Sequence, residues 1–238
     1  MAEKVILGLC TSGTRLKIAA AAGARTARAQ KKVYNQERFL FALVKRTLAA
    51  AGSDLRRVDT VCAARGPGRF TGIRISLTLA GALKALAGAA VYTATLFEIL
   101  ALQAAGTAHF KKWRAAGGRR LAVLVHAFKD EYFCQFFTAG PLPRPAGEPA
   151  WLKAEELRAL LAAQPEPFYA VADAEEEPGI YGLLPPAAAR APGSVSKILP
   201  AFVIKAALAY KNHTLKPLYL KPAKYEQQNN VRPEPAKA

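Results

Sequence analysis

The chain is predicted to be an α/β protein of two domains, and three observations support this. Its 238 residues are enough for one large domain or two small ones. Over the first 106 residues, short apolar runs alternate with longer segments of helical periodicity. Glycines stand at the ends of these segments, where helices stop and strands turn.

Three strands joined by tight turns are expected first. Residues 5–11 are apolar on both faces, which is typical of a buried strand. Residues 16–22 follow a Ser-Gly-Thr turn, so they are expected to pair antiparallel to the first strand. Residues 25–33 are more polar and are expected at the edge of the sheet.

Helices and strands then alternate. Apolar residues recur at three- and four-residue spacing over 36–51, which predicts a helix that stops at Gly52. The next expected elements are strands over 58–64 and 90–95 and helices over 71–87 and 96–105. The order β-β-β-α-β-α-β-α places three antiparallel strands before two right-handed crossovers. This is the order of a ribonuclease-H-like half, the repeating unit of the actin, Hsp70 and sugar-kinase superfamily.

The second half reads as a shortened, degenerate echo of the first. The expected segments are a basic linker over 111–120, a hairpin over 121–139 that turns at Lys129-Asp130, a proline-rich loop over 141–149, a helix over 154–163, a strand over 168–172 and irregular chain over 175–192. A last helix over 195–210 is expected to pack back on the first domain. The expected division is an N-terminal domain over 1–106, a smaller C-terminal domain over 107–222 and a disordered tail over 223–238.

Charge is the strongest feature of the composition. The chain has 34 Lys and Arg against 17 Asp and Glu, a formal net charge of +17. This favours a polyanionic partner, with nucleic acid the leading candidate and an acidic protein partner as the alternative. Basic clusters occupy residues 25–32, 111–120 and 211–224. Aromatic residues that suit stacking on bases interleave with two of them, namely Trp113, Tyr219 and Tyr225.

Cysteine usage and apolar runs indicate the compartment. The three cysteines form no C-x-x-C pair, which argues against a disulfide framework. The apolar run over 5–9 is too short for a signal peptide or a membrane span. We therefore expect a protein of the reducing cytoplasm with no membrane partner.

The most informative segment is Arg65-Gly66-Pro67-Gly68-Arg69-Phe70-Thr71-Gly72-Ile73-Arg74, between an expected strand and an expected helix. Such a glycine-rich turn usually permits close approach to a phosphate or to another chain. Its spacing differs from the dinucleotide fingerprint, and no Walker A Gly-Lys-Ser/Thr is present. Because Arg69 and Phe70 stand at the helix entrance, a surface for a protein partner is favoured. A phosphate contact and a purely structural turn remain as alternatives.

The first hairpin is a second candidate site. In phosphate-binding members of the superfamily it carries an acidic residue followed by Thr or Ser and Gly, which position a metal and hold phosphate. Here Cys10 stands in the acidic place. Thr11, Ser12 and Gly13 keep their donors and are the candidate cofactor-binding residues, with an ordinary polar hairpin as the alternative.

The histidines and cysteines of the sequence give little support for a metal site or a catalytic nucleophile. His109, His126 and His213 are far apart in sequence, and none has a partner at helical spacing, so no metal site is expected. Cys10 and Cys62 lie in or beside expected buried strands, where thiols are usually inert. No catalytic residue is assigned.

Taken together, these segments resemble the TsaB (YeaZ) family. The matching segments are Ile6-Leu7-Gly8-Leu9-Cys10-Thr11-Ser12, Glu37-Arg38-Phe39-Leu40, the glycine turn extended to Ile75, and Pro217-Leu218-Tyr219-Leu220-Lys221. The order of elements fits over roughly residues 4–222, whereas residues 111–191 match poorly by sequence.

The resemblance implies a non-catalytic relative of TsaD, which pairs with TsaD through helices of the N-terminal domain. With the ATPase TsaE, that pair transfers a threonylcarbamoyl group from its adenylate to the adenosine beside the anticodon of tRNAs that read ANN codons. TsaD carries a metal-binding histidine pair, and the absence of such a pair here agrees with the TsaB role. By motif match, the implied partner-binding residues are Asn35, Arg38, Phe39, Gly66, Arg69, Phe70, Thr71, Arg74 and Leu77.

The chain departs from the family at Cys10, Asn35 and His126, where Asp, His and Asp are usual. These changes weaken nucleotide or metal binding by this chain alone, while ATP or ADP at the subunit boundary and a homodimer stay open. The expected partners are a TsaD-type paralogue, a TsaE-type ATPase and tRNA, bound directly or through the complex. The alternatives are a diverged stand-alone RNA-binding protein, an ATP-dependent small-molecule kinase and, weakest, a protease acting on its paralogue.

Overall fold

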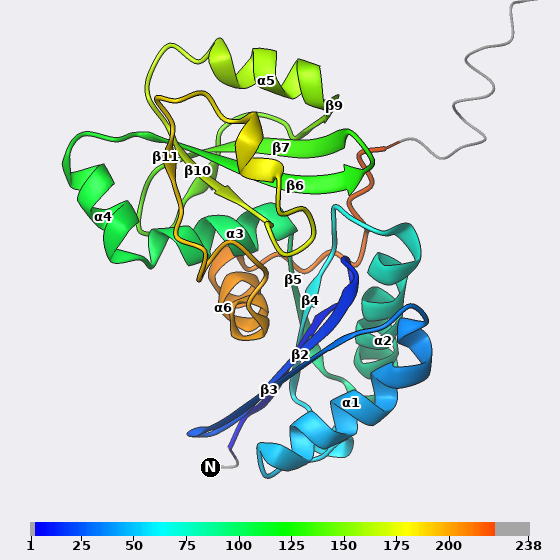
Figure 1. Ribbon diagram of the computed structural model, residues 1–238. Helices are drawn as coiled ribbons and strands as arrows, with labels where there is room; N and C mark the ends of the chain where they lie inside the picture. Colours follow the sequence, from blue (N-terminus) through cyan, green and yellow to red (C-terminus); the bar gives the residue numbers. More distant parts are fainter. Residues whose placement is uncertain (1–2, 222–238) are drawn as a thin grey trace, which may run out of the picture.

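Two β-sheets stand one above the other, with two helices between them (Figure 1). The computed structural model describes residues 3–221. The expected tail over 223–238, with Tyr225, lies outside the described residues.

The first sheet has the strand order β3-β2-β1-β4-β5. Its strands are β1 (Val5–Cys10), β2 (Arg15–Ala22), β3 (Arg25–Lys32), β4 (Thr60–Ala64) and β5 (Ala90–Ala94). The first three strands pair antiparallel, and β1, β4 and β5 pair parallel. The central strands are buried and β3 is the exposed edge, because apolar runs form the former and a polar run forms the latter. The predicted order of elements is confirmed.

Two helices, α1 (Gln36–Ala50) and α2 (Phe70–Ala87), cover the outer face of this sheet (Figure 1). The α1 residues Leu40, Val44 and Leu48 are buried against it. Gly88 ends α2 in the left-handed conformation, with φ 66°. Among residues 3–221, α2 is the helix that is long and apolar enough to cross a membrane by length and composition alone. It packs along β4 and β5, and 39% of it is buried, so its outer side faces solvent.

The second sheet has the order β11-β10-β6-β7-β8, with β9 also paired to β7. Its strands are β6 (Arg120–Phe128), β7 (Glu131–Thr138), β8 (Arg144–Pro145), β9 (Ala150–Lys153), β10 (Tyr169–Ala172) and β11 (Ala189–Arg190). The expected hairpin is β6-β7, with Lys129 in the turn at φ 52°. Helix α5 (Ala154–Ala162) covers the outer side, next to the 3-10 turn η2 (Ile180–Leu183).

Helices α3 (Leu96–Ala105) and α6 (Pro200–Tyr210) lie between the sheets (Figure 1). Helix α6 packs on β1, β4 and β5 of the first sheet, α3 packs on β6 and β10 of the second, and the two helices touch. Gly8 permits this approach, since a Cβ there would lie 2.7 Å from the Ile204 side chain. Each half of the chain thus supplies a helix to the other half's sheet, and one hydrophobic cluster spans both domains.

Two sequence expectations are wrong. The basic linker over 111–120 is instead helix α4 (Ala108–Ala115) and the start of β6. Thr107 caps α4 by accepting a hydrogen bond from the Phe110 N–H, and Phe110 is buried while the lysines face solvent. The last helix begins at Pro200 rather than at 195, because proline suits the first turn of a helix and residues 193–197 form turns and bends.

Candidate partner-binding surface

The glycine turn packs backbone to backbone on the β1-β2 hairpin. A Cβ on Gly72 would lie 2.0 Å from the Thr11 carbonyl oxygen, and one on Gly68 would lie 2.5 Å from that of Ser12. The Arg69 N–H donates to the Ser12 carbonyl at 2.8 Å, and the Thr11 hydroxyl donates to the Gly72 carbonyl at 2.5 Å. The glycines therefore serve close approach within this chain, and the turn positions the side chains beside it.

The segment over 217–221 closes the other side of the turn. The Leu218 N–H donates to the Arg65 carbonyl at 2.7 Å, and a Cβ on Gly66 would lie 2.6 Å from the Leu218 carbonyl oxygen. Gly66 itself has φ 112°. Two segments of the resemblance that are far apart in sequence therefore lie side by side.

Phe70, Arg74 and Tyr219 form one stacked group at this junction. The rings of Phe70 and Tyr219 stack with centroids 4.6 Å apart, and the Arg74 Cζ lies 3.9 Å from the Phe70 centroid. The Arg74 Nε also donates to the Tyr219 hydroxyl at 3.1 Å. Even so, Phe70 is 48% exposed and Tyr219 is 38% exposed. These contacts restrict three side chains that remain open to solvent.

Two further aromatic and basic pairs lie beside the start of α1. The Lys31 Nζ lies 3.8 Å from the Phe39 centroid, and the Arg69 Cζ lies 5.8 Å from that of Tyr34, which is 86% exposed. We call this surface the arginine–aromatic face and define it as Tyr34, Phe39, Arg69, Phe70, Arg74 and Tyr219. Its residues come from the start of α1, the start of α2 and the segment over 217–221.

The nine implied partner-binding residues fall into two groups. Those exposed to solvent are Asn35, Arg38, Phe39, Arg69, Phe70, Thr71 and Arg74. Gly66 and Leu77 are buried and support the surface from beneath. The implied set omits Tyr34 and Tyr219, although the closing motif of the family resemblance contains Tyr219.

The first hairpin holds carboxylates of the second domain. Both Glu176 carboxylate oxygens accept from the Thr14 N–H at 3.0 Å, and one also accepts from the Thr14 hydroxyl at 3.1 Å. Glu175 pairs with Arg15 at 3.2 Å and with Lys17. These contacts join the two domains through the turn that was expected to hold phosphate.

The geometry does not support the expected cofactor role of Thr11, Ser12 and Gly13. The side chains of Thr11 and Ser12 are buried, and the Thr11 hydroxyl is engaged with Gly72. Glu176 covers Gly13, since a Cβ there would lie 2.5 Å from its Oε1. A bound phosphate at this turn would face two carboxylates of the same chain.

The same junction contains a buried acid. Burial raises the pKa of Asp173 from 3.8 to about 6, nearby Lys17 lowers that pKa, and Glu176 and Glu175 raise it further. Its Oδ1 has no hydrogen-bond partner among the described residues. The stability of this junction between the domains therefore depends on whether Asp173 is charged.

Within residues 3–221, no group of three His, Cys, Asp or Glu residues is arranged to hold a metal ion. His109 bonds the Tyr169 hydroxyl at 3.0 Å, whereas His126 and His213 bond backbone carbonyls. Burial raises the pKa of Cys62 and that of Cys134 to about 12. In the described part of the chain, no cysteine or serine stands beside a histidine as a nucleophile requires.

The fold and this surface define a class: a two-domain α/β protein whose exposed arginine–aromatic face adjoins a hairpin filled by Glu176. The predicted fold class is confirmed.

Comparison with known proteins narrows the class. Residues 35–131 match the family model of TsaD, tRNA N6-adenosine threonylcarbamoyltransferase. YeaZ from Pseudomonas aeruginosa has a TM-score of 0.67 and 22% identity, covering 91% of this chain and 100% of its own. An uncharacterized protein with similarity to peptidase YeaZ from Pseudomonas aeruginosa gives the same TM-score and identity, covering 93% of this chain and 100% of its own. No curated protein matches by sequence.

The resemblance to the TsaB (YeaZ) family therefore extends to the fold: the chain is similar in structure to YeaZ, and one segment of it matches the TsaD family model. That segment includes α1, the glycine turn and α2, the elements that supply most of the arginine–aromatic face.

Proposed function

We propose that this chain is a non-catalytic cytoplasmic subunit that binds and supports a TsaD-type transferase in the synthesis of tRNA threonylcarbamoyladenosine. The observation that carries the proposal is the arginine–aromatic face, built on the two outer helices of the first domain. The transferase binds this face, and a TsaE-type ATPase and tRNA join through the resulting complex.

The arginine–aromatic face is exposed to solvent. Aromatic and arginine side chains carry most of the binding energy in protein interfaces, where they are surrounded by other contacts that exclude water. Here Phe70, Tyr219 and Tyr34 remain exposed, and the outer side of α2 continues the apolar surface to Leu86. An apolar surface of this kind marks an interaction site.

Restriction of the side chains strengthens the argument. Binding costs about 0.5–1.5 kcal/mol for each flexible side chain that becomes immobilised. The stacking of Phe70 on Tyr219 and the contacts of Arg74 already limit these rotamers in the free chain. The face is thus prepared for a partner at reduced entropic cost.

The non-catalytic part of the proposal has separate support. The thiols are buried, and the hairpin that would hold phosphate in a kinase of this fold is filled by Glu175 and Glu176. Both observations disfavour a small-molecule kinase and a protease for this chain.

The test measures how tightly two variants of this chain, Phe70→Asp and Phe128→Asp, bind the TsaD-type paralogue from the same organism. Phe128 lies in the second domain and is 57% exposed, so the control adds the same charge at similar exposure. We expect Phe70→Asp to weaken binding by about 30-fold or more, the loss typical of a hot spot. Phe128→Asp should bind like the wild type, and circular dichroism should show both variants folded. Unchanged capture by Phe70→Asp would overturn the proposal.

A further inference from the structure

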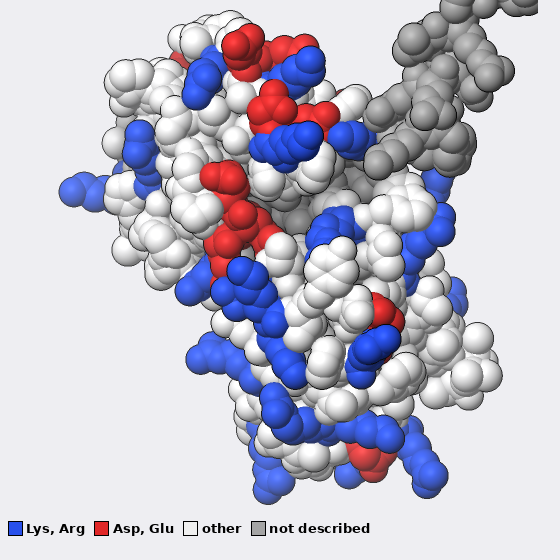
Figure 2. Space-filling view, turned by 45° about the vertical axis from the view of Figure 1, so that its right-hand side comes forward, with Lys and Arg blue, Asp and Glu red and all other residues white. Residues whose placement is uncertain are grey.

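Positive charge is divided unevenly between the two domains. Residues 3–106 contain 16 Lys and Arg against 5 Asp and Glu, whereas residues 107–221 contain 15 against 10. Figure 2 shows this division, with blue side chains spread over the lower domain and red ones gathered over the upper domain. The first domain therefore carries most of the excess charge.

Five cations of the first domain gather at one end of it. Strand β3 runs beside α1, and its first residue, Arg25, lies against Gly52 just beyond the end of α1: a Cβ on Gly52 would be 2.6 Å from the Arg25 Nη1. The 3-10 helix η1 (Leu55–Arg57) follows. We call this region the basic end and define it as Arg25, Lys45, Arg46, Arg56 and Arg57, all of which are exposed.

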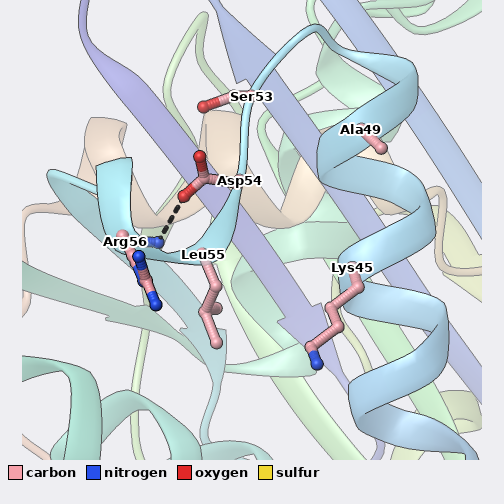
Figure 3. Close-up of a pocket in the computed structure, with 6 residues that line it drawn as sticks. All are labelled: Lys45, Ala49, Ser53, Asp54, Leu55 and Arg56. Atoms are coloured by element: carbon pink, nitrogen blue, oxygen red, sulfur yellow. Dashed lines mark hydrogen bonds between the residues drawn. The ribbon is translucent and has the colours of Figure 1, made fainter.

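The basic end surrounds a hollow between α1 and η1. Figure 3 shows Lys45 on one side of it and Arg56 on the other, with Leu55 between them. Asp54 also lines the hollow, and its Oδ1 accepts from the Arg56 N–H at 2.8 Å.

Within the described range 3–221, the cations of the basic end have no acidic partner at ion-pair distance. The salt bridges among residues 3–221 join Arg15 and Lys17 to Glu175, and Lys221 to Glu131. The carboxylates of Asp54, Asp59 and Glu3 lie in or beside this region, so its five cations leave a net positive charge. A polyanion that binds there relieves the mutual repulsion of the cations.

The residues that line the hollow of the basic end indicate which kind of polyanion binds there. The hollow is lined by Ala49, Leu55 and polar or charged residues, with no aromatic ring on which a base can stack. The aromatic side chains of the arginine–aromatic face lie at the other end of α1 and at the start of α2. The exposed ring of Phe41 lies one turn before Lys45 on α1, outside the lining of the hollow. The cations of the hollow, which have no ring among them, suit the phosphate backbone of a helical stem, which proteins recognise by shape and charge.

Residues 111–120, one of the two basic clusters whose aromatic residues were expected to stack on bases, are less suited to stacking in the structure. Trp113 of α4 packs against Phe110 and Tyr169, with centroids 5.7 Å and 5.4 Å apart. Its ring is therefore engaged within the protein while Lys111, Lys112 and Arg114 face solvent. Helix α4 supplies a matched control surface.

We infer that the basic end binds the phosphate backbone of a double-stranded stem of a folded RNA. The inference rests on the proposed function in one respect only, because the complex's substrate tRNA is a folded RNA with such stems. The surface itself is separate from the arginine–aromatic face.

The test compares two triple variants of the full chain, each of which removes three exposed charges. The first is Lys45→Gln, Arg46→Gln and Arg56→Gln at the basic end. The control is Lys111→Gln, Lys112→Gln and Arg114→Gln on α4. Fluorescence anisotropy measures binding to a labelled RNA hairpin, and to an unpaired RNA of equal length, at about 50 mM and about 200 mM salt.

We expect the hairpin to bind more tightly than the unpaired strand, with affinity that falls as salt rises. The basic-end variant should bind the hairpin about tenfold more weakly at low salt and with a shallower salt dependence, while the α4 variant stays within about twofold of the wild type. An equal loss in both variants, a preference for the unpaired strand, or no binding by the wild type would overturn the inference.

Two crossed measurements separate this inference from the proposed function. The basic-end variant should still capture the TsaD-type paralogue, and Phe70→Asp should still bind the hairpin. Hairpin binding without capture by the wild type would reject the proposed function and leave the RNA site standing. Capture of the paralogue without hairpin binding would reject the RNA site and leave the proposed function standing.

Discussion

Replacing Gly72 by alanine tests whether the glycine turn is a close internal contact. A Cβ at this position would lie 2.0 Å from the Thr11 carbonyl oxygen, a backbone atom of a buried hairpin. Ordinary contact begins at about 3.4 Å, so α2 and the hairpin would have to separate by about 1.4 Å. That movement breaks the hydrogen bonds from the Thr11 hydroxyl to Gly72 and from the Arg69 N–H to Ser12.

The lost hydrogen bonds and the helix preference of alanine set the expected change in the free energy of unfolding. Each buried group left without its partner costs about 1–3 kcal/mol, and alanine in a helix returns about 1 kcal/mol relative to glycine. We therefore expect Gly72→Ala to lower the free energy of unfolding by about 2–4 kcal/mol. The variant should also weaken capture of the TsaD-type paralogue, because Arg69 and Phe70 move with the turn.

Denaturant unfolding followed by circular dichroism measures the change, with Gly81→Ala as the control. Gly81 lies in the same helix, and a Cβ there would be 3.6 Å from Leu215, which is ordinary contact. The control should be as stable as the wild type or up to about 1 kcal/mol more stable. If Gly72→Ala also unfolds at or above the wild-type midpoint, the close-contact explanation is wrong.

Two further predictions concern the junction between the domains. Glu175→Gln should destabilise the fold by about 3 kcal/mol in denaturant unfolding, because it leaves the ammonium of Lys17, which is 3% exposed, without its partner. The exposed control Glu155→Gln should change little, and equal losses in the two variants would contradict the reasoning. The pKa of Asp173 is raised from 3.8 to about 6, so the folded state binds its proton more tightly than the unfolded state, and wild-type stability falls as pH rises between these values. Asp173→Asn should therefore gain about 2 kcal/mol on the wild type between pH 4 and pH 8, and a stability difference independent of pH would refute this.

The first domain could be predicted from sequence because its signals are local. Apolar runs bounded by Gly13, Gly23, Gly52 and Gly88 set the strands and helices to within about two residues. The α4 helix was harder to predict because its charged side chains and its flanking glycines over 117–118 suggest a linker. Its Thr107 cap and the buried Phe110 are the signals that indicate a helix instead.

The candidate site was only partly predictable, because much of it depends on contacts between distant residues. The glycine turn and Phe70 were evident in sequence, but the stacking of Tyr219 on Phe70 depends on the return of the segment over 217–221 to the turn. The occupation of the first hairpin by Glu176 likewise joins residues of two domains. No local pattern around Thr14 indicates that a carboxylate takes the place expected for phosphate.

The most direct test of the central claim is amide hydrogen exchange of the wild-type chain, alone and with the TsaD-type paralogue of the same organism. We predict slower exchange in the complex over residues 34–42 and 69–78, which contain the start of α1 and most of the arginine–aromatic face. Unchanged exchange in both segments, with protection confined to the second domain, would contradict this prediction.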